Sequence, residues 1–281
     1  MFIDGTLVIW LVLALAVIVL FLRAAGASFS LLITSLIMAI TAGKLSLSAF
    51  AIVILVLSGI YFSNKKNAIP RPLLIIFVLV WCVALFHHWL PGFNNFHVLK
   101  NVQAKPLSIP FNMYLNLDKP LIFFSLFLVY PNLLGQGSKF KIRPVNYYGI
   151  ACALLLLAML LPAASILGKI SPDFSLPSWW WLFAFNNLVF TCVVEEALFR
   201  GYIQQNLSRR FGFFVSIILT SMLFGVEHVH YGSLFVFFAS LAGLGYGIVF
   251  HFSRRLWATV LTHFLFNFSW LLFYTYPMLK S

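Results

Sequence analysis

The feature that most constrains this chain is a succession of long apolar runs with very few charged residues inside them. Of its 281 residues, 62% are apolar and 9% are charged, and the mean hydropathy is +1.01. A soluble domain carries about 25% charged residues, so a water-soluble fold could not cover this much apolar surface. A lipid bilayer is the solvent that accommodates it. The runs are continuous rather than alternating, which argues against a transmembrane β-barrel.

The runs have the length of membrane-spanning helices, which need roughly 20 apolar residues. We therefore expect an all-α fold, a polytopic transmembrane bundle of about 8–10 helices. The expected helices are Thr6–Leu22, Ala27–Ala42, Leu45–Phe62, Pro72–Leu90, Leu121–Leu134, Tyr148–Leu167, one from Trp179 to about Leu207, Phe213–Val226, Leu234–Phe252 and Leu256–Tyr276. The polar stretch Pro91–Pro120 is interpreted as a loop, because it is too polar to span a bilayer.

The net charge of +12 also fits a membrane protein. On a soluble protein it would suggest a nucleic-acid partner, but here the basic residues separate the apolar runs. They are typical of topology signals and of contacts with anionic lipid. We expect a multi-pass integral protein of the cell membrane, in contact with the lipid bilayer and with no nucleic-acid partner.

Two adjacent glutamates stand near the middle of the helix expected to begin at Trp179. An ionisable group inside a bilayer costs about 2.5–3.5 kcal/mol on insertion scales, so it needs a reason. Glu196 and Arg200 are four residues apart and can pair on one helix face. Glu195 points roughly 100° away, on a stripe with Asn187 and Thr191 that holds no cation. An unpaired carboxyl of this kind suits general-base chemistry.

Two later helices carry further polar groups. His228 follows Phe224 by four residues, and His263 and Asn267 are four residues apart on one face of an apolar run. Each group has an ordinary explanation, since a histidine at a helix end is usually interfacial and an intramembrane His–Asn pair can join helices by hydrogen bonds. Together with Glu195, however, they indicate one polar chamber shared by three helices.

The segment Ala242–Phe250 is rich in glycine. Gly243 and Gly247 form a GxxxG pattern, which lets another helix approach closely. A nucleotide-binding interpretation would need a strand before the glycines, and the sequence offers none. We therefore assign this segment to helix packing.

Three ordered motifs resemble those of the CPBP family, the CAAX-processing and bacteriocin-processing intramembrane proteases of the type II CAAX endopeptidase kind. The family patterns EExxxR, FxxxH and HxxxN are matched by Glu195-Glu196-xxx-Arg200, Phe224-xxx-His228 and His263-xxx-Asn267. The resemblance covers about Trp179–Tyr276, and the first half of the chain has no motif that we can assign.

The resemblance implies roles for the matching positions. Glu195 would activate a water molecule, with His228 assisting. His263 and Asn267 would donate hydrogen bonds to the oxyanion of the tetrahedral intermediate. Glu196 and Arg200, the expected ion pair of the first motif, would shape the site.

The same resemblance implies an organisation and a substrate class. We expect residues 146–281 to form a CPBP-like catalytic transmembrane domain and residues 1–145 to supply accessory transmembrane helices. The expected activity is cleavage of a peptide bond in a membrane-associated protein, or in a leader or CAAX-like peptide. The sequence does not name that substrate.

A metal ion is the alternative left open for the chemistry. Glu195, His228 and His263 could hold Zn²⁺ with a bound water, which would give a metalloendopeptidase. No HExxH pattern occurs, and the two histidines come from different helices. We favour a glutamic protease without a cofactor over a zinc enzyme.

Two other functions fit part of the pattern. A non-catalytic membrane protein, of an immunity or chaperone-like kind, could retain the family motifs, although the complete motif set argues against a decayed site. A proton-coupled transporter would also use intramembrane Glu and His. The polar groups are confined to one small set, and the two halves of the chain show no repeat of the kind that many transporters have.

Overall fold

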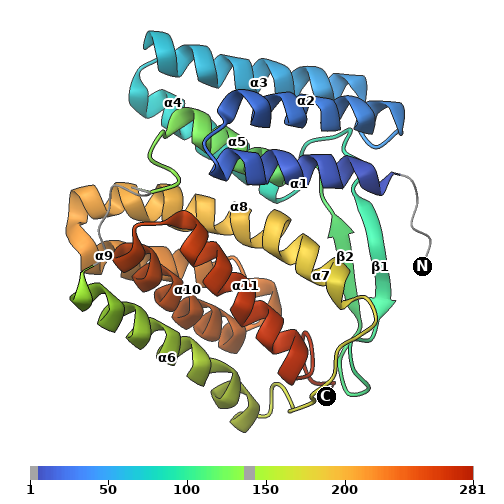
Figure 1. Cartoon of the computed structure of the whole chain (residues 1–281), viewed down its shortest axis with the longest axis vertical. Helices are drawn as coiled ribbons and strands as arrows, with labels where there is room; N and C mark the ends of the chain where they lie inside the picture. The colour runs from blue at the N-terminus through green and yellow to red at the C-terminus, as the bar shows by residue number, and fades with distance from the viewer. Residues whose placement is uncertain (1–5, 136–142, 281) are drawn as a thin grey trace. The chain divides into compact units, whose positions relative to one another are not determined.

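The computed structural model describes residues 6–135 and 143–280, and most of them are helical (Figure 1). The helices are α1 (Leu7–Phe21), α2 (Ala25–Thr41), α3 (Leu47–Lys66), α4 (Arg71–Phe86), α5 (Pro120–Val129), α6 (Pro144–Ile166), α7 (Trp180–Asn186), α8 (Val193–Glu196), α9 (Gln205–Val226), α10 (Ser233–Ser253) and α11 (Leu256–Phe273). Two strands, β1 (Phe96–Val102) and β2 (Phe111–Leu115), pair in a two-stranded sheet.

Within the described residues, five helical segments are long and apolar enough to cross a membrane. They are Leu47–Lys66, Pro144–Ile166, Trp180–Val226, Ser233–Ser253 and Leu256–Phe273. Four shorter apolar helices accompany them: α1, α2, α4 and α5. The prediction of an all-α, polytopic bundle is confirmed, and the chain is an integral membrane protein.

The interpretation of Pro91–Pro120 as a loop is wrong at two places, because β1 and β2 lie inside it. The paired strands are joined by the side chains of Asn101 and Asn112, where Asn112 Nδ2 donates to Asn101 Oδ1 at 3.0 Å. An isolated hairpin is marginal in water, so packing beyond the pair matters. The ring of Phe111 stacks on Trp179 at 5.7 Å between centroids. Trp179 is distant from Phe111 in the sequence, so no local sequence pattern predicts this packing.

The two helices expected around Trp179–Leu207 and Phe213–Val226 form one helical segment of 47 residues, Trp180–Val226. The expected break is present as a kink, because Gly212 has φ 77° and ψ −178° inside α9. Such a conformation is open to glycine and strained for other residues. The segment therefore changes direction where the sequence predicts a new helix.

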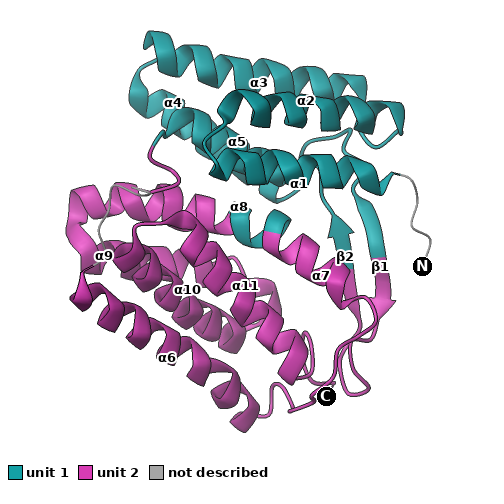
Figure 2. Cartoon of the chain, viewed as in Figure 1, with its two compact units in different colours: residues 1–98, 113–131, 189–194 teal, residues 99–112, 132–188, 195–281 magenta. Residues whose placement is uncertain are grey.

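The chain divides into two compact units (Figure 2). Unit 1 contains residues 1–98, 113–131 and 189–194, and unit 2 contains residues 99–112, 132–188 and 195–281. Neither unit is a single stretch of chain. The predicted division at residue 145 into accessory and catalytic parts stays a prediction.

Unit 1 joins its helices with small hydroxyl groups. Ser28 and Ser35 on α2 donate to backbone carbonyls of α1, Ala16 O at 2.6 Å and Ile9 O at 3.0 Å. Trp81 Nε1 on α4 donates to Ser125 Oγ on α5 at 3.1 Å. Small residues let membrane helices approach closely, and their hydroxyls then find partners across the contact.

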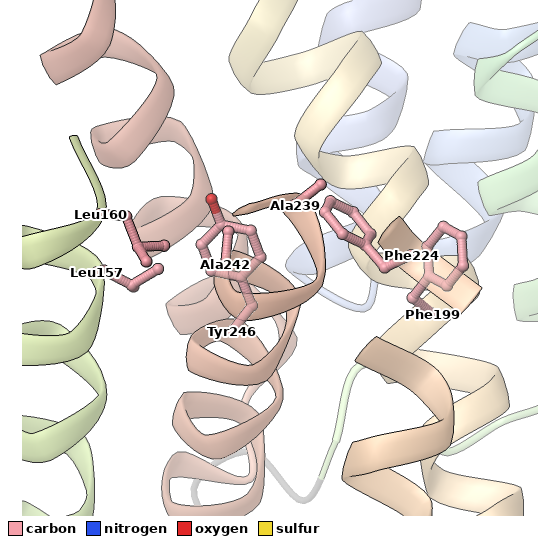
Figure 3. Packing of buried hydrophobic residues seen from close by; sticks show 7 residues of the cluster. All are labelled: Leu157, Leu160, Phe199, Phe224, Ala239, Ala242 and Tyr246. Carbon is pink, nitrogen blue, oxygen red and sulfur yellow. The ribbon is translucent and has the colours of Figure 1, made fainter. Parts of the chain in front are cut away.

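Unit 2 is built around α10, which packs against α6, α9 and α11. One buried apolar cluster joins three of these helices and is drawn in Figure 3. It consists of Leu157, Leu160, Phe199, Phe224, Ala239, Ala242 and Tyr246. Phe199 and Phe224 meet edge to face with centroids 5.2 Å apart. This cluster forms one wall of the polar site described below.

The segment after α11 runs back along two backbone edges of unit 2. Ile109 N donates to Met278 O at 3.1 Å, and Thr275 N donates to Ser171 O at 2.9 Å. Lys105, whose side chain is fully buried, donates to Asp173 O and to Leu272 O at the carboxyl end of α11. A cation there complements the carbonyls that a helix end leaves unpaired.

Candidate active site

The two glutamates lie between two stretches of π-helix. Asn187–Cys192 and Ala197–Gln204 are π-helical, and α8 between them holds Glu195 and Glu196. A π-helix widens the turn to i→i+5 hydrogen bonds; it is rare and is frequently found at functional sites. This local geometry distinguishes α8 from the other apolar helices of residues 6–135 and 143–280.

Glu196 and Arg200 form the ion pair that their spacing predicts. Arg200 Nη1 donates to Glu196 Oε1 at 3.1 Å, and both side chains are fully buried. A buried pair of this kind needs further hydrogen bonds to offset its lost hydration. Arg200 Nη2 supplies one by donating to Gly243 O at 2.9 Å.

The glycines of α10 allow that contact. A Cβ added at Gly243 would lie 3.2 Å from Arg200 Nη2, and one added at Gly247 would lie 3.0 Å from Gln204 Oε1. Gln204 Nε2 donates to Gly247 O at 2.9 Å, one helical turn from the arginine contact. The predicted close approach at GxxxG is present, and it brings two side chains of the glutamate-bearing segment onto carbonyls of α10.

His263 joins the two glutamates. Its Nδ1 is 2.8 Å from Glu196 Oε1, and its Nε2 is 4.0 Å from Glu195 Oε2. Because the Glu196 oxygen also accepts from Arg200, we assign the Nδ1 proton to His263 as donor. The neutral ring then presents an unprotonated Nε2 toward Glu195.

The two glutamates differ in the exposure of their side chains. The Glu195 side chain is 14% exposed, whereas that of Glu196 is fully buried. Glu195 is therefore the less enclosed of the two carboxylates. This difference agrees with the helix-face argument that separated Glu195 from the Glu196–Arg200 pair.

His228 follows the end of α9 and is anchored by its own turn. Its Nδ1 is 2.9 Å from Phe224 O, and a carbonyl only accepts, so Nδ1 donates and Nε2 is left unprotonated in the neutral ring. The Phe224 ring contacts both histidines, with centroids 5.1 Å from His228 and 5.7 Å from His263. One aromatic ring is therefore shared by the two histidines.

Asn267 lies one turn beyond His263 on α11. Its Nδ2 donates to Asn187 Oδ1 at 3.3 Å, at the long end of the hydrogen-bond range. This contact uses one of the two amide protons of Asn267. The contact orients the side-chain amide of Asn267.

Two residues near the site belong to none of the three motifs. Asn187 was noted in the sequence only for its place on the Glu195 stripe, and it meets Asn267. Tyr246 lay inside a segment assigned to packing, and its ring stacks on His263. An aromatic residue three positions after a glycine that faces another helix is a weak signal, so sequence alone could not select it.

The alternative of a zinc site held by Glu195, His228 and His263 can be tested against this geometry. A zinc site in an enzyme takes three protein ligands at about 2.0–2.2 Å. Among residues 6–135 and 143–280, no three His, Cys, Asp or Glu side chains are grouped closely enough to hold a metal ion. The donor set therefore does not fit zinc as it stands, and we derive no step through a metal.

Comparison with known proteins adds one match. Residues 177–269 match the family model described as type II CAAX prenyl endopeptidase Rce1-like. No curated protein and no solved structure matched the chain. The matched range contains the three motifs and every residue of the polar cluster described above. Residues 177–269 therefore belong to the Rce1-like family of type II CAAX prenyl endopeptidases, the CPBP intramembrane proteases.

Proposed function

We propose that Glu195 is the general base of a glutamic intramembrane endopeptidase. The family implies protease activity on a protein or peptide substrate in the membrane. In the proposed reaction, Glu195 takes a proton from water while the water oxygen bonds to the scissile carbonyl carbon. Collapse of the tetrahedral intermediate breaks the C–N bond, and the leaving amine takes the proton back from Glu195.

The charge of the tetrahedral intermediate is received by Asn267 and His263 in this proposal. Asn267 would donate from its side-chain amide. His263 can donate from Nε2 only as an imidazolium, since its Nδ1 proton is held by Glu196. That cation would have a carboxylate facing each nitrogen, at 2.8 Å and 4.0 Å. Donors fixed in advance in a dry site are the largest usual source of rate enhancement.

In this proposal the half-buried His228 assists the proton transfer. With Nδ1 bound to Phe224 O, its Nε2 can accept or return a proton. The Glu196–Arg200 pair holds His263 and does not itself contact the reacting atoms. The family match alone does not assign these roles to particular atoms.

One observation carries the proposal. A partly accessible carboxylate, Glu195, lies 4.0 Å from a histidine that a second, buried carboxylate orients. A structural ion pair needs only the second carboxylate. The additional glutamate costs free energy in a membrane, and a proton-transfer role accounts for it.

The experiment compares membrane proteins of cells that make the wild type with those of cells that make Glu195→Gln. The substitution keeps size and polarity and removes the base. We expect one or a few precursors to accumulate uncut with the variant. A matched control is Glu227→Gln, which changes an exposed glutamate just after α9. Identical cleavage products with Glu195→Gln and wild type would refute the role of Glu195.

The same comparison names the substrate. The precursor that accumulates shows whether the protein cuts a CAAX-like terminus, a leader peptide or another membrane-associated segment. Cell fractionation in parallel tests the proposed location in the cell membrane.

A further inference from the structure

The helix α10 contributes none of the motif residues, yet it supplies the flat surface against His263. The Tyr246 ring lies 4.5 Å from the His263 ring between centroids, with an interplanar angle of 19°. Tyr246 is 1% exposed. Stacked and offset arrangements of this kind are favourable for aromatic pairs.

A single hydrogen bond does not fix the direction of an imidazole. The bond from His263 Nδ1 to Glu196 Oε1 holds one atom, and the ring can still turn about that contact. The face of Tyr246 removes this freedom on one side, and the Phe224 ring closes another at 5.7 Å and 78°. With the ring plane held, Nε2 stays directed toward Glu195.

Tyr246 is itself held by several contacts. The Arg200 guanidinium carbon lies 5.3 Å from its ring centroid, and the Phe224 ring meets it at 5.9 Å with an angle of 90°. One turn earlier on α10, Gly243 O accepts from the same arginine. The arginine therefore connects the glutamate that orients His263 with the tyrosine that stacks on it.

We propose that Tyr246 is a positioning residue for His263, acting through the flat face of its ring. This inference rests on the proposed function and adds to it a residue outside the family motifs. The ring keeps the imidazole plane fixed, so that Nε2 stays directed toward Glu195 and the oxyanion. The phenol hydroxyl is not needed for this role.

The test measures kcat and KM for purified Tyr246→Phe and Tyr246→Leu. The probe is an internally quenched peptide that ends in a farnesylated CAAX-type sequence, or the precursor found to accumulate with Glu195→Gln. For Tyr246→Leu we expect kcat to fall about 10- to 100-fold with little change in KM. Tyr246→Phe keeps the stacked face and should stay within about threefold of the wild type.

A matched control separates positioning from general loss of packing. Phe250, one turn further along α10, is 3% exposed, and no ring contact joins it to His263 among the described residues. Phe250→Leu should lower thermal stability about as much as Tyr246→Leu and leave kcat unchanged. If Tyr246→Leu does not reach the membrane, Tyr246→Met, which fills a similar volume, replaces it.

A second readout is the pH profile of kcat. A residue that positions a group of the active site changes the shape of the pH profile, whereas lost packing lowers the whole profile equally. A change in the shape of the pH profile that occurs in Tyr246→Leu but not in Tyr246→Phe supports the proposal. Equal losses for the phenylalanine and leucine variants, an effect on KM only, or wild-type kcat in Tyr246→Leu would each overturn it.

Glu195→Gln is assayed in the same series. If Glu195→Gln retains activity, the proposed function fails whatever Tyr246 does. If Glu195→Gln is inactive and Tyr246→Leu is as active as the wild type, the proposed function stands and the role of Tyr246 is refuted.

Discussion

Each of the two units holds a histidine paired with a buried carboxylate, and the two pairs differ in their surroundings. In unit 1, His88 Nδ1 lies 2.6 Å from Asp118 Oδ2, and the histidine side chain is 40% exposed. In unit 2, His263 Nδ1 lies 2.8 Å from Glu196 Oε1, and the histidine side chain is 5% exposed. The pairing alone is therefore not what distinguishes the candidate site.

The difference is in the groups around each pair. Asp118 lies just before α5, and its Oδ1 accepts from Asn95 Nδ2 at 3.2 Å and from the amide of Lys119 at 2.9 Å. Those contacts fix a turn at the start of a helix, as acidic residues often do. In unit 2 a second carboxylate, Glu195, faces the other nitrogen of the histidine. A His–carboxylate pair becomes a candidate for proton transfer when a second, partly exposed acid lies beside it.

The largest expected effect comes from breaking the buried ion pair of unit 2. Arg200→Met leaves Glu196 charged and buried, and removing one partner of such a pair typically costs about 3–5 kcal/mol. Thermal unfolding in detergent measures the loss. Arg210→Met is the matched control, since Arg210 is exposed on α9 and its change should be nearly neutral. Equal melting temperatures for Arg200→Met and the wild type would show that the pair is not structural.

The next effect separates an oxyanion donor from an ordinary buried amide. Asn267→Ala should lower kcat about 10²- to 10³-fold, the usual cost of one lost oxyanion donor. Asn146 is the control, because its Nδ2 donates to Phe252 O at 2.8 Å at the start of α6. Asn146→Ala should reduce stability and leave kcat unchanged. An Asn267→Ala enzyme with wild-type kcat would remove this residue from the mechanism.

Substitution in the unit 1 pair sharpens the comparison. Asp118→Asn removes the charge that His88, Asn95 and the amide of Lys119 share, and should cost about 1–3 kcal/mol of stability. Cleavage of the probe peptide should proceed at the wild-type rate once the protein is folded. Loss of activity in a fully folded Asp118→Asn protein would mean that the unit 1 pair also takes part in the reaction.

The smallest expected effect concerns Lys105. Burial lowers the pKa of its ammonium, and the nearby Asp173 carboxylate raises that pKa by a smaller amount. A pKa below the unfolded value means that the folded state binds this proton less tightly, so stability rises as pH increases through the folded pKa toward 10.5. Lys105→Met should abolish this rise and cost about 1–2 kcal/mol from two unpaired carbonyls. The check is the difference in melting temperature between the two proteins, followed from neutral to alkaline pH.

Most of the fold could be predicted from the sequence, because each spanning helix coincides with a continuous run of apolar residues. The Glu196–Arg200 pair and the helix break near Gly212 could also be predicted, because each depends on residues that are close together in the sequence. The hairpin of β1 and β2 was missed because its support, including the Phe111–Trp179 stacking, comes from distant residues. Tyr246 was missed for the same reason, since only the packing of α10 brings its ring to His263.

The residues of the candidate site could be predicted from the sequence, but the orientations of their side chains could not. Spacing separated Glu195 from Glu196, yet it could not show that His263 would meet both. Nor could it show which histidine nitrogen carries the proton, because that depends on acceptors such as Phe224 O and Glu196 Oε1. Contacts between helices decide such details, and no periodicity within one helix encodes them.

The account rests on Glu195 as the group that takes the proton from water. The most direct measurement is single-turnover cleavage of the accumulated precursor by purified Glu195→Gln beside the wild type, with the melting temperature of each. The account predicts a fall in rate of at least about 10³-fold and an unchanged melting temperature. A variant that cuts the precursor within about tenfold of the wild-type rate would contradict it.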